Sequence, residues 1–264
     1  VMMTTDISYI GMAVGMALLA VPVWIFYKLG LARQIGSTLT AVARMVLQLF
    51  LTGLYLRYLF EWNSPWVNVL WVLLMVAVAS FTVSRNTRLR MRLIVLPLLA
   101  GLSGAALAVG LYFLLFVLNL PHPFDSRYFI PVMGILTGNM LGVCVMGLNT
   151  FYDGLQRERQ FFLYMLGNGA SHAEAIKPFV RRAIEKSLAP CIANIAVMGM
   201  VSLPETVIGQ ILGGTAPGIA VKYQMMLAVI IFSASMLALL TTLFFADRRS
   251  FDAYVRLRDV RIRK

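Results

Sequence analysis

Long apolar segments separated by short polar connections occupy most of the chain. Because a helix needs about 20 mostly apolar residues to cross a bilayer, the pattern predicts about seven crossings, of which the sixth is the weakest. Its apolar stretch breaks at Pro204 and resumes over Thr206–Leu212. The predicted fold is all-α, a polytopic membrane helix bundle in which residues 1–264 form one transmembrane domain. The expected crossings are Ile7–Tyr27, Thr38–Phe60, Pro65–Val83, Leu93–Leu118, Phe129–Asn149, Pro190–Leu203 and Gln224–Ala246.

The composition agrees with a membrane protein. Of the 264 residues, 60% are hydrophobic and only 13% are charged, whereas soluble domains carry about a quarter charged residues. The two cysteines, Cys144 and Cys191, lie inside apolar segments, so we expect free thiols rather than a disulfide or a metal site. No soluble domain remains to carry the net charge of +12, so a nucleic-acid partner is not expected.

The basic residues predict the orientation of the bundle. All but three of the 23 Lys and Arg residues fall on one side of the predicted crossings, the exceptions being Arg57, Arg127 and Lys222. Because Lys and Arg are retained in cytoplasmic connections, the N-terminus is expected outside and the C-terminus in the cytoplasm, with the bacterial inner membrane as the location. The basic tail, residues 247–264, is expected to lie on anionic lipid or to dock on an ATPase subunit.

The longest connection, residues 153–190, is predicted to be a cytoplasmic loop with a break in its middle. Gly167 and Gly169 supply backbone angles that other residues avoid, so a helix is expected to end near Leu166. The residues that follow read as the beginning of another helix.

Ser171 and Glu174 have the spacing of a capping box, in which each side chain accepts a hydrogen bond from the other residue's backbone N–H. A short helix is therefore expected to begin near Ser171, with Pro178 shortening or kinking it. Such a transverse helix is the shape by which an ABC permease engages its ATPase, and a plain connecting loop is the open alternative. The candidate coupling residues are Gly167, Gly169, Ala170, Ser171, Glu174 and Ala175.

The chain contains no G-x-x-x-x-G-K-[ST] run and therefore has no P-loop for ATP. It is not expected to be an enzyme or to bind a cofactor itself. ATP and Mg²⁺ are expected in a separate ATPase subunit.

Polar and small residues inside the apolar segments are the remaining candidates for function. Polar groups at membrane depth must find partners or line a cavity, and the candidates for a transport pathway are Gln48, Asn139, Asn194, Glu205 and Gln210. Glu205 is also the one acid placed to bind a transported metal, unless it lies in water at the outer interface. Glycines at four-residue spacing let helices approach closely, and Gly134, Gly138 and Gly142 are predicted to do so.

Several blocks of sequence resemble the FetB-type permease family, the membrane half of a bacterial iron exporter related to plant aluminium-tolerance ABC permeases. The resemblance covers nearly the whole chain in the same order. One departure stands out, because the family's Ser-Leu-Pro-Gly continues here as Ser-Leu-Pro-Glu, with Glu205 replacing the glycine. The blocks are Ala41–Phe60, Ile130–Asn149, Gly167–Pro190, Val201–Pro204, Gly213 and Lys222–Gln224.

The resemblance implies a permease subunit of an ABC transporter that exports iron or another metal cation. It further implies an ATPase partner that docks on Gly167–Lys186 and a second copy of this chain, all within membrane lipid. Two other classes stay open at this point: a secondary transporter, although no internal repeat is present, and a membrane sensor or assembly factor that transports nothing.

Overall fold

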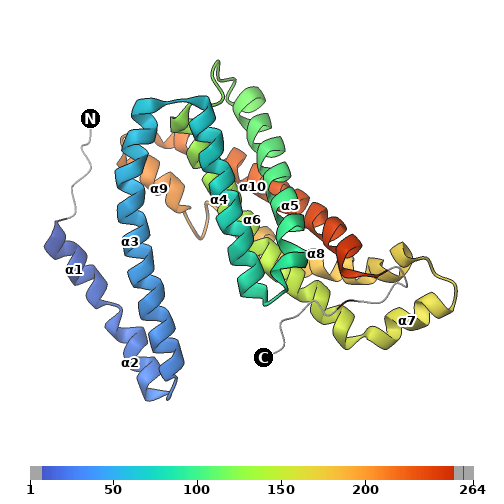
Figure 1. The fold of residues 1–264 in the computed structure, drawn as a ribbon. Coiled ribbons are helices and arrows are strands. Elements are labelled where there is room, and N and C mark those ends of the chain that lie inside the picture. Colours follow the sequence, from blue (N-terminus) through green and yellow to red (C-terminus); the bar gives the residue numbers. More distant parts are fainter. Residues whose placement is uncertain (1–7, 253–257, 259–264) are drawn as a thin grey trace.

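The computed structural model describes residues 8–252 and 258, and every regular element within them is helical (Figure 1). The predicted all-α bundle is confirmed. The described part contains ten α-helices and one π-helical segment: α1 Tyr9–Ala17, α2 Ala20–Lys28, α3 Ala32–Trp62, α4 Pro65–Thr87, α5 Met91–Tyr112, η1 Phe113–Val117, α6 Ser126–Arg157, α7 Arg159–Gly167, α8 His172–Val197, α9 Glu205–Leu212 and α10 Pro217–Ser250.

Six of the predicted crossings correspond to helical segments that are long and apolar enough to span a membrane. The helices extend a few residues beyond the predicted bounds at most ends, as in α6, which has 32 residues. The first crossing is divided into α1 and α2 near Leu18. Pro22 accounts for the break, because proline has no N–H to donate to the carbonyl four residues earlier.

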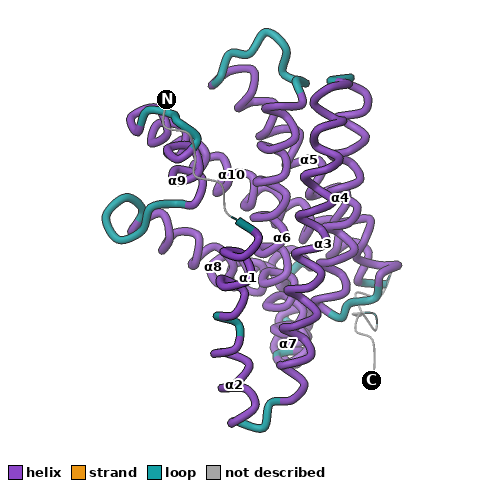
Figure 2. The backbone as a smooth tube through the Cα atoms, turned by 90° about the vertical axis from the view of Figure 1, so that its left-hand side faces the viewer, coloured by secondary structure: helices purple, strands orange, loops and turns teal. Residues whose placement is uncertain are grey.

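The sixth predicted crossing, Pro190–Leu203, is not a single membrane-length helix in the structure. No single helix between α6 and α10 meets the length and hydropathy of a span. Instead, α8 is followed by the non-helical segment 198–204 and the short helix α9, and Gly199 in that segment has φ +89°. The break before Thr206 was expected, whereas the beginning at Pro190 was wrong because Pro190 lies inside α8. Figure 2 shows the loop between α8 and α9 standing out from the bundle.

The connectivity requires the α8–α9 unit to carry the chain from one end of the bundle to the other. One end, here called the basic end, holds the α4–α5 turn and the ends of α6 and α10, where Tyr152 and Ser250 are hydrogen-bonded at 2.5 Å. The beginning of α10 lies at the opposite end, beside Leu118 and Arg127. Because α6 ends at the basic end and α10 begins at the opposite end, the α8–α9 unit connects the two ends, while six helical segments of the described residues are long and apolar enough to cross a membrane.

Four helices, α4, α5, α6 and α10, form most of the buried core, and α8 adds Ala175, Ile176, Phe179 and Ala183 to it (Figure 1). Glycines allow their close approach. A Cβ on Gly101 of α5 would meet Thr242 and Ala238 of α10, and a Cβ on Gly110 would lie 2.6 Å from Met133 Cε of α6.

The predicted glycine stripe of α6 is only partly used inside the chain. A Cβ on Gly134 would lie 3.2 Å from Met75 Cε of α4, whereas Gly138 and Gly142 have open space around them. Helix packing at the last two positions stays a prediction.

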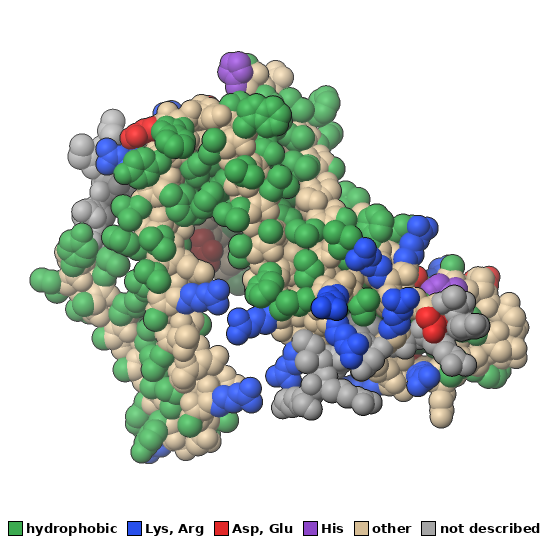
Figure 3. Space-filling view, viewed as in Figure 1, with side chains coloured by type: hydrophobic (Ala, Val, Ile, Leu, Met, Phe, Trp, Pro, Cys, Tyr) green, Lys and Arg blue, Asp and Glu red, His purple; other side chains and the backbone are tan. Residues whose placement is uncertain are grey.

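The first three helices form an outlying layer. Within the described residues, α1 and α2 bury no side chain and α3 buries only Leu59. Figure 3 shows a mostly hydrophobic surface on this layer, and an open space between it and the core at the basic end, with Lys and Arg side chains on both sides. The layer therefore offers apolar surface to lipid, or to another chain, along most of its length.

Candidate coupling face and transport pathway

The junction between α7 and α8 is a sharp, well-defined turn at the basic end. Gly169 has φ +87°, in the left-handed region that glycine adopts without strain. Its N–H donates to Leu166 O at 3.1 Å, closing the end of α7, which finishes at Gly167. The predicted helix end near Leu166 is confirmed.

The predicted capping box at Ser171 is confirmed in full. The Ser171 backbone N–H donates to Glu174 Oε2 at 2.8 Å, and the Glu174 N–H donates to Ser171 Oγ at 3.4 Å. The backbone and side-chain donors of Ser171 hold the pKa of the Glu174 carboxyl below its ordinary value. The carboxylate also lies in the first turn, where the helix dipole favours a negative charge.

The helix that follows is long, which corrects the prediction of a short one. It runs for 26 residues, through both Pro178 and Pro190. Each proline removes one backbone hydrogen bond, and the buried residues Ala175, Phe179 and Ala183 hold the helix against its neighbours. The predicted loop of residues 153–190 is consequently helical over most of its length.

The helix α7 projects sideways from the bundle (Figure 1), and several of its apolar side chains are exposed. Of its nine residues only Phe162 is buried, whereas Phe161, Leu163 and Tyr164 are exposed. Phe162 packs beside Phe179 of α8 with ring centroids 6.4 Å apart. The junction is therefore fixed to α8 on one side and open to a partner on the other.

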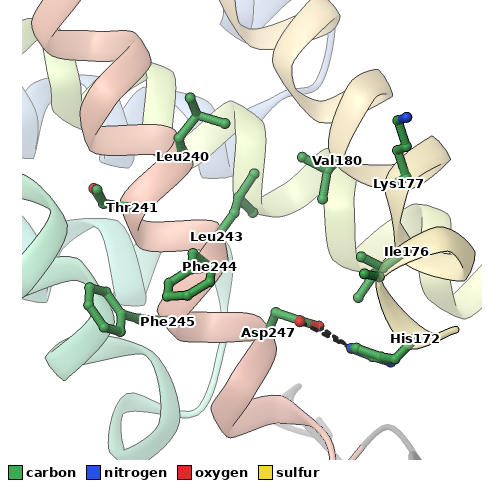
Figure 4. A pocket seen from close by; sticks show the side chains of 11 residues that line it. His172, Ile176, Lys177, Val180, Leu240, Thr241, Leu243, Phe244, Phe245 and Asp247 are labelled. Carbon is green, nitrogen blue, oxygen red and sulfur yellow. Dashed lines mark hydrogen bonds and ion pairs between the residues drawn. The ribbon is translucent and has the colours of Figure 1, made fainter.

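His172, the first residue of α8, connects this junction to the last crossing. Its Nε2 lies 3.0 Å from Asp247 Oδ1 and 3.1 Å from Oδ2 (Figure 4). The imidazole also lies edge-on to Phe162 and Phe251, at centroid distances of 6.0 and 4.7 Å. A displacement of the junction would therefore act directly on the end of α10.

A polar pocket of about 640 Å³ lies at the basic end between α6 and α8. Its charged lining includes Asp153, Glu158 and Arg182, and the last two form an ion pair between the helices. The exposed Gly142 lies at the edge of the same pocket. The pocket is thus continuous with the open part of the glycine stripe.

The five pathway candidates do not meet in one site. Gln48 on α3, Asn139 on α6, Asn194 on α8 and Glu205 at the beginning of α9 are all exposed. Gln210 lines a cavity of about 420 Å³, which it shares with Arg127, Thr215 and Tyr223 near the opposite end. Within the described residues the Gln210 Oε1 atom is buried without a hydrogen-bond partner, so this side chain has unused capacity to bind a solute or water.

Metal-binding groups are dispersed. No group of three or more His, Cys, Asp or Glu residues that could hold a metal ion occurs in the part of the chain that the structure describes. A metal role for Glu205 stays a prediction. Cys144 is a buried free thiol, as expected, and Cys191 is free and partly buried.

Sequence reasoning missed the link between His172 and Asp247. The two residues are 75 positions apart, and no local spacing connects them. A charged residue at the end of the last apolar run was the available signal, because such an acid needs a partner.

The helices and the exposed junction define a class of protein: a multi-pass helical membrane protein in which the α7–α8 junction projects at the basic end. Within that class the particular family is shown by sequence. The chain matches the uncharacterised protein family UPF0014 over residues 7–251, and it belongs to this family.

Three relatives illustrate the breadth of the family. The chain is 31% identical over 208 residues to Protein ALUMINUM SENSITIVE 3 of Arabidopsis thaliana, covering 78% of this chain and 74% of the relative. It is 30% identical to the UPF0014 membrane protein STAR2 of rice, covering 84% and 76%. It is 25% identical to the Probable iron export permease protein FetB of Escherichia coli, covering 94% of both chains. No solved structure matches the chain.

Proposed function

We propose that the chain is the permease subunit of an ABC transporter, energised by a separate ATPase that docks on the Gly167–Lys186 segment. The observation that carries the proposal is the capped α7–α8 junction, which projects at the basic end of a chain without a P-loop. A partner that hydrolyses ATP would find there an exposed apolar face on α7 and a rigid helix beginning at His172.

The coupling route runs through two contacts. A push on the junction acts on α10 through His172 and Asp247, and on α6 through the Arg182–Glu158 ion pair. Both α6 and α10 belong to the core. Closure of an ATPase dimer would in this way rotate core helices rather than bend a free loop.

The translocation unit would contain a second copy of the chain. The open positions Gly138 and Gly142 on α6 have no neighbour within 4 Å of an added Cβ, and small residues along one helix face allow close contact between helices in lipid. Asn139 lies between them on the same exposed stretch. A dimer that met along this face would bring two copies of Asn139 to a shared path.

The cargo in this proposal is iron or another metal cation, moved outward. The support for both the cargo and the direction is the likeness to the E. coli relative, whose name describes a probable iron export permease. A transported cation needs only transient contacts with oxygen and nitrogen atoms, and Asn139, Glu205 and Gln210 offer such atoms at separate depths.

The test is reconstitution with the P-loop ATPase encoded nearest to the gene for this chain. Co-purification and ATP turnover are measured for wild type, Gly169→Pro and Gly104→Ala, each with and without ferrous iron. Gly169→Pro cannot adopt φ +87° and should abolish coupling. Gly104 lies in regular helix α5, outside the docking segment, with open space around it, so the control Gly104→Ala should retain coupling.

The outcomes separate the parts of the proposal. A stable complex whose turnover rises with iron, and which Gly169→Pro disrupts, supports the coupled metal exporter. A stable complex whose ATP turnover does not respond to iron would support the permease assignment and contradict iron as the cargo. Failure of wild type to bind any P-loop ATPase would sink the ABC assignment.

A further inference from the structure

A groove between α8 and α10 at the basic end has the chemistry of a lipid site. Its volume is about 750 Å³, within the range of sites that enclose small molecules. Figure 4 shows Ile176 and Val180 of α8 facing Leu240, Leu243 and Phe244 of α10 across it. These aliphatic and aromatic side chains would accept a hydrocarbon chain and give a polar solute nothing to bind.

The rims of the groove carry positive charge. Lys177 is exposed and lines the α8 side. On the α10 side the Arg248 guanidinium lies 4.2 Å from the centre of the Phe244 ring, which itself lines the groove. One basic group therefore stands on each wall.

The acids nearby are already engaged. Asp247 pairs with His172 where the groove ends, Glu174 accepts from Ser171, and Glu185 pairs with Arg181 at 2.8 Å. Lys177 and Arg248 each attract one of these acids, Glu174 and Asp247 respectively, but neither basic group forms an ion pair among the described residues, so both can still meet an outside anion.

We propose that this groove binds an anionic phospholipid, with one acyl chain along the apolar walls and the headgroup phosphate at the basic rim to which Lys177 and Arg248 contribute. Basic pockets between membrane helices bind anionic headgroups, each Lys or Arg near the surface contributing about 1 kcal/mol, or about fivefold in affinity. A free phosphate ion would leave the apolar walls empty, and a zwitterionic lipid would gain less from the two basic groups.

This inference rests on the membrane location and not on ATP-driven transport. The two walls of the groove belong to α8, which begins at the junction, and to α10, the last crossing. A lipid in the groove would bridge α8 and α10 beside the His172–Asp247 pair, so anionic lipid would strengthen the mechanical link between the junction and the core.

The experiment is native mass spectrometry of the full chain purified in detergent and titrated with phosphatidylglycerol, phosphatidylcholine or inorganic phosphate. Wild type should retain phosphatidylglycerol in preference to phosphatidylcholine and should retain no phosphate. The double variant Lys177→Gln with Arg248→Gln should lose most of that preference, about fivefold for each charge. Val180→Trp, which fills the groove, should reduce retention of both lipids.

Two controls keep the result interpretable. Lys186→Gln removes a charge from the same helix, but Lys186 lines the polar pocket on the α6 side, so lipid preference should be unchanged. Lys177→Arg should preserve the preference and shows that the protein tolerates substitution there. Equal retention of the two lipids by wild type would overturn the proposal, as would a preference that survives in the double variant.

Discussion

The contact between α5 and α10 provides a sharp test of the core. A Cβ on Gly101 would lie 3.0 Å from the Ala238 carbonyl oxygen and 3.1 Å from Thr241 Oγ1, and it would overlap Thr242 Oγ1. A Cβ on Gly104, three residues along the same helix, would meet nothing within 4 Å. The pair therefore offers one substitution in two environments.

The magnitude follows from separating helix propensity from packing. Replacing Gly by Ala in a helix interior gains about 1 kcal/mol of propensity, and this gain is common to both positions. Overpacking a close contact costs about 1–3 kcal/mol. We expect Gly101→Ala to be less stable than Gly104→Ala by about 1–3 kcal/mol, because the Ala238 carbonyl belongs to the backbone and cannot rotate away.

The measurement is thermal unfolding of both variants in the same detergent, where each kcal/mol corresponds to about 2–4 °C for a chain of this size. A second substitution refines it. Thr242→Ala removes the overlapping hydroxyl, so the double variant Gly101→Ala with Thr242→Ala should regain part of the lost stability. Equal unfolding temperatures for the Gly101 and Gly104 variants would refute the close approach of α5 and α10.

Three further predictions follow from the site. The His172–Asp247 pair is about a quarter exposed, and a double-mutant cycle with His172→Ala and Asp247→Ala should give a coupling energy of about 1–2 kcal/mol; a value below about 0.3 kcal/mol would contradict the link. The pKa of Glu174 is lowered in the folded chain, so the Glu174 carboxylate stabilises the start of α8 above about pH 4.3, and this stabilisation is lost as pH falls through the lowered pKa. Amide hydrogen exchange at Ser171 should report the loss. In Glu174→Gln the exchange should show no such transition over this pH range. Chelation by EDTA should leave the unfolding temperature of the purified chain unchanged, and a clear drop would reveal a resident metal.

The parts of the fold that the sequence predicted are those governed by local rules. Apolar runs of bilayer length specify crossings whatever they pack against, and the Ser171–Glu174 box depends on residues three apart. The prolines show where local rules stop. Pro178 was expected to shorten or kink a short helix and Pro190 to begin a crossing, yet α8 continues through both, with Phe179 and Leu188 buried beside them.

The site was less predictable because its contacts join distant segments. His172 and Asp247 meet only after α6, α8 and α10 have packed. Gln210 was selected for its polarity alone, and its place in a cavity with Arg127 depends on the fold of α9 beside α10. The other four pathway candidates are exposed in a single chain. They would line a pathway only if another molecule covered them, and the sequence of one chain does not show such a contact.

The length of α8 changes the mechanism that a short coupling helix would imply. A short helix can only pass force to its immediate attachment points. At about 1.5 Å per residue, the 26 residues of α8 extend for about 39 Å from His172 at the basic end to the non-helical segment 198–204. A tilt imposed at the capped end would therefore reach the break before Glu205 through one helix, with the contacts to α6 and α10 acting as the pivot. If an ATPase docks at the junction as proposed, the segment 198–204 and α9 would move, and Gln210 on α9 would move with them.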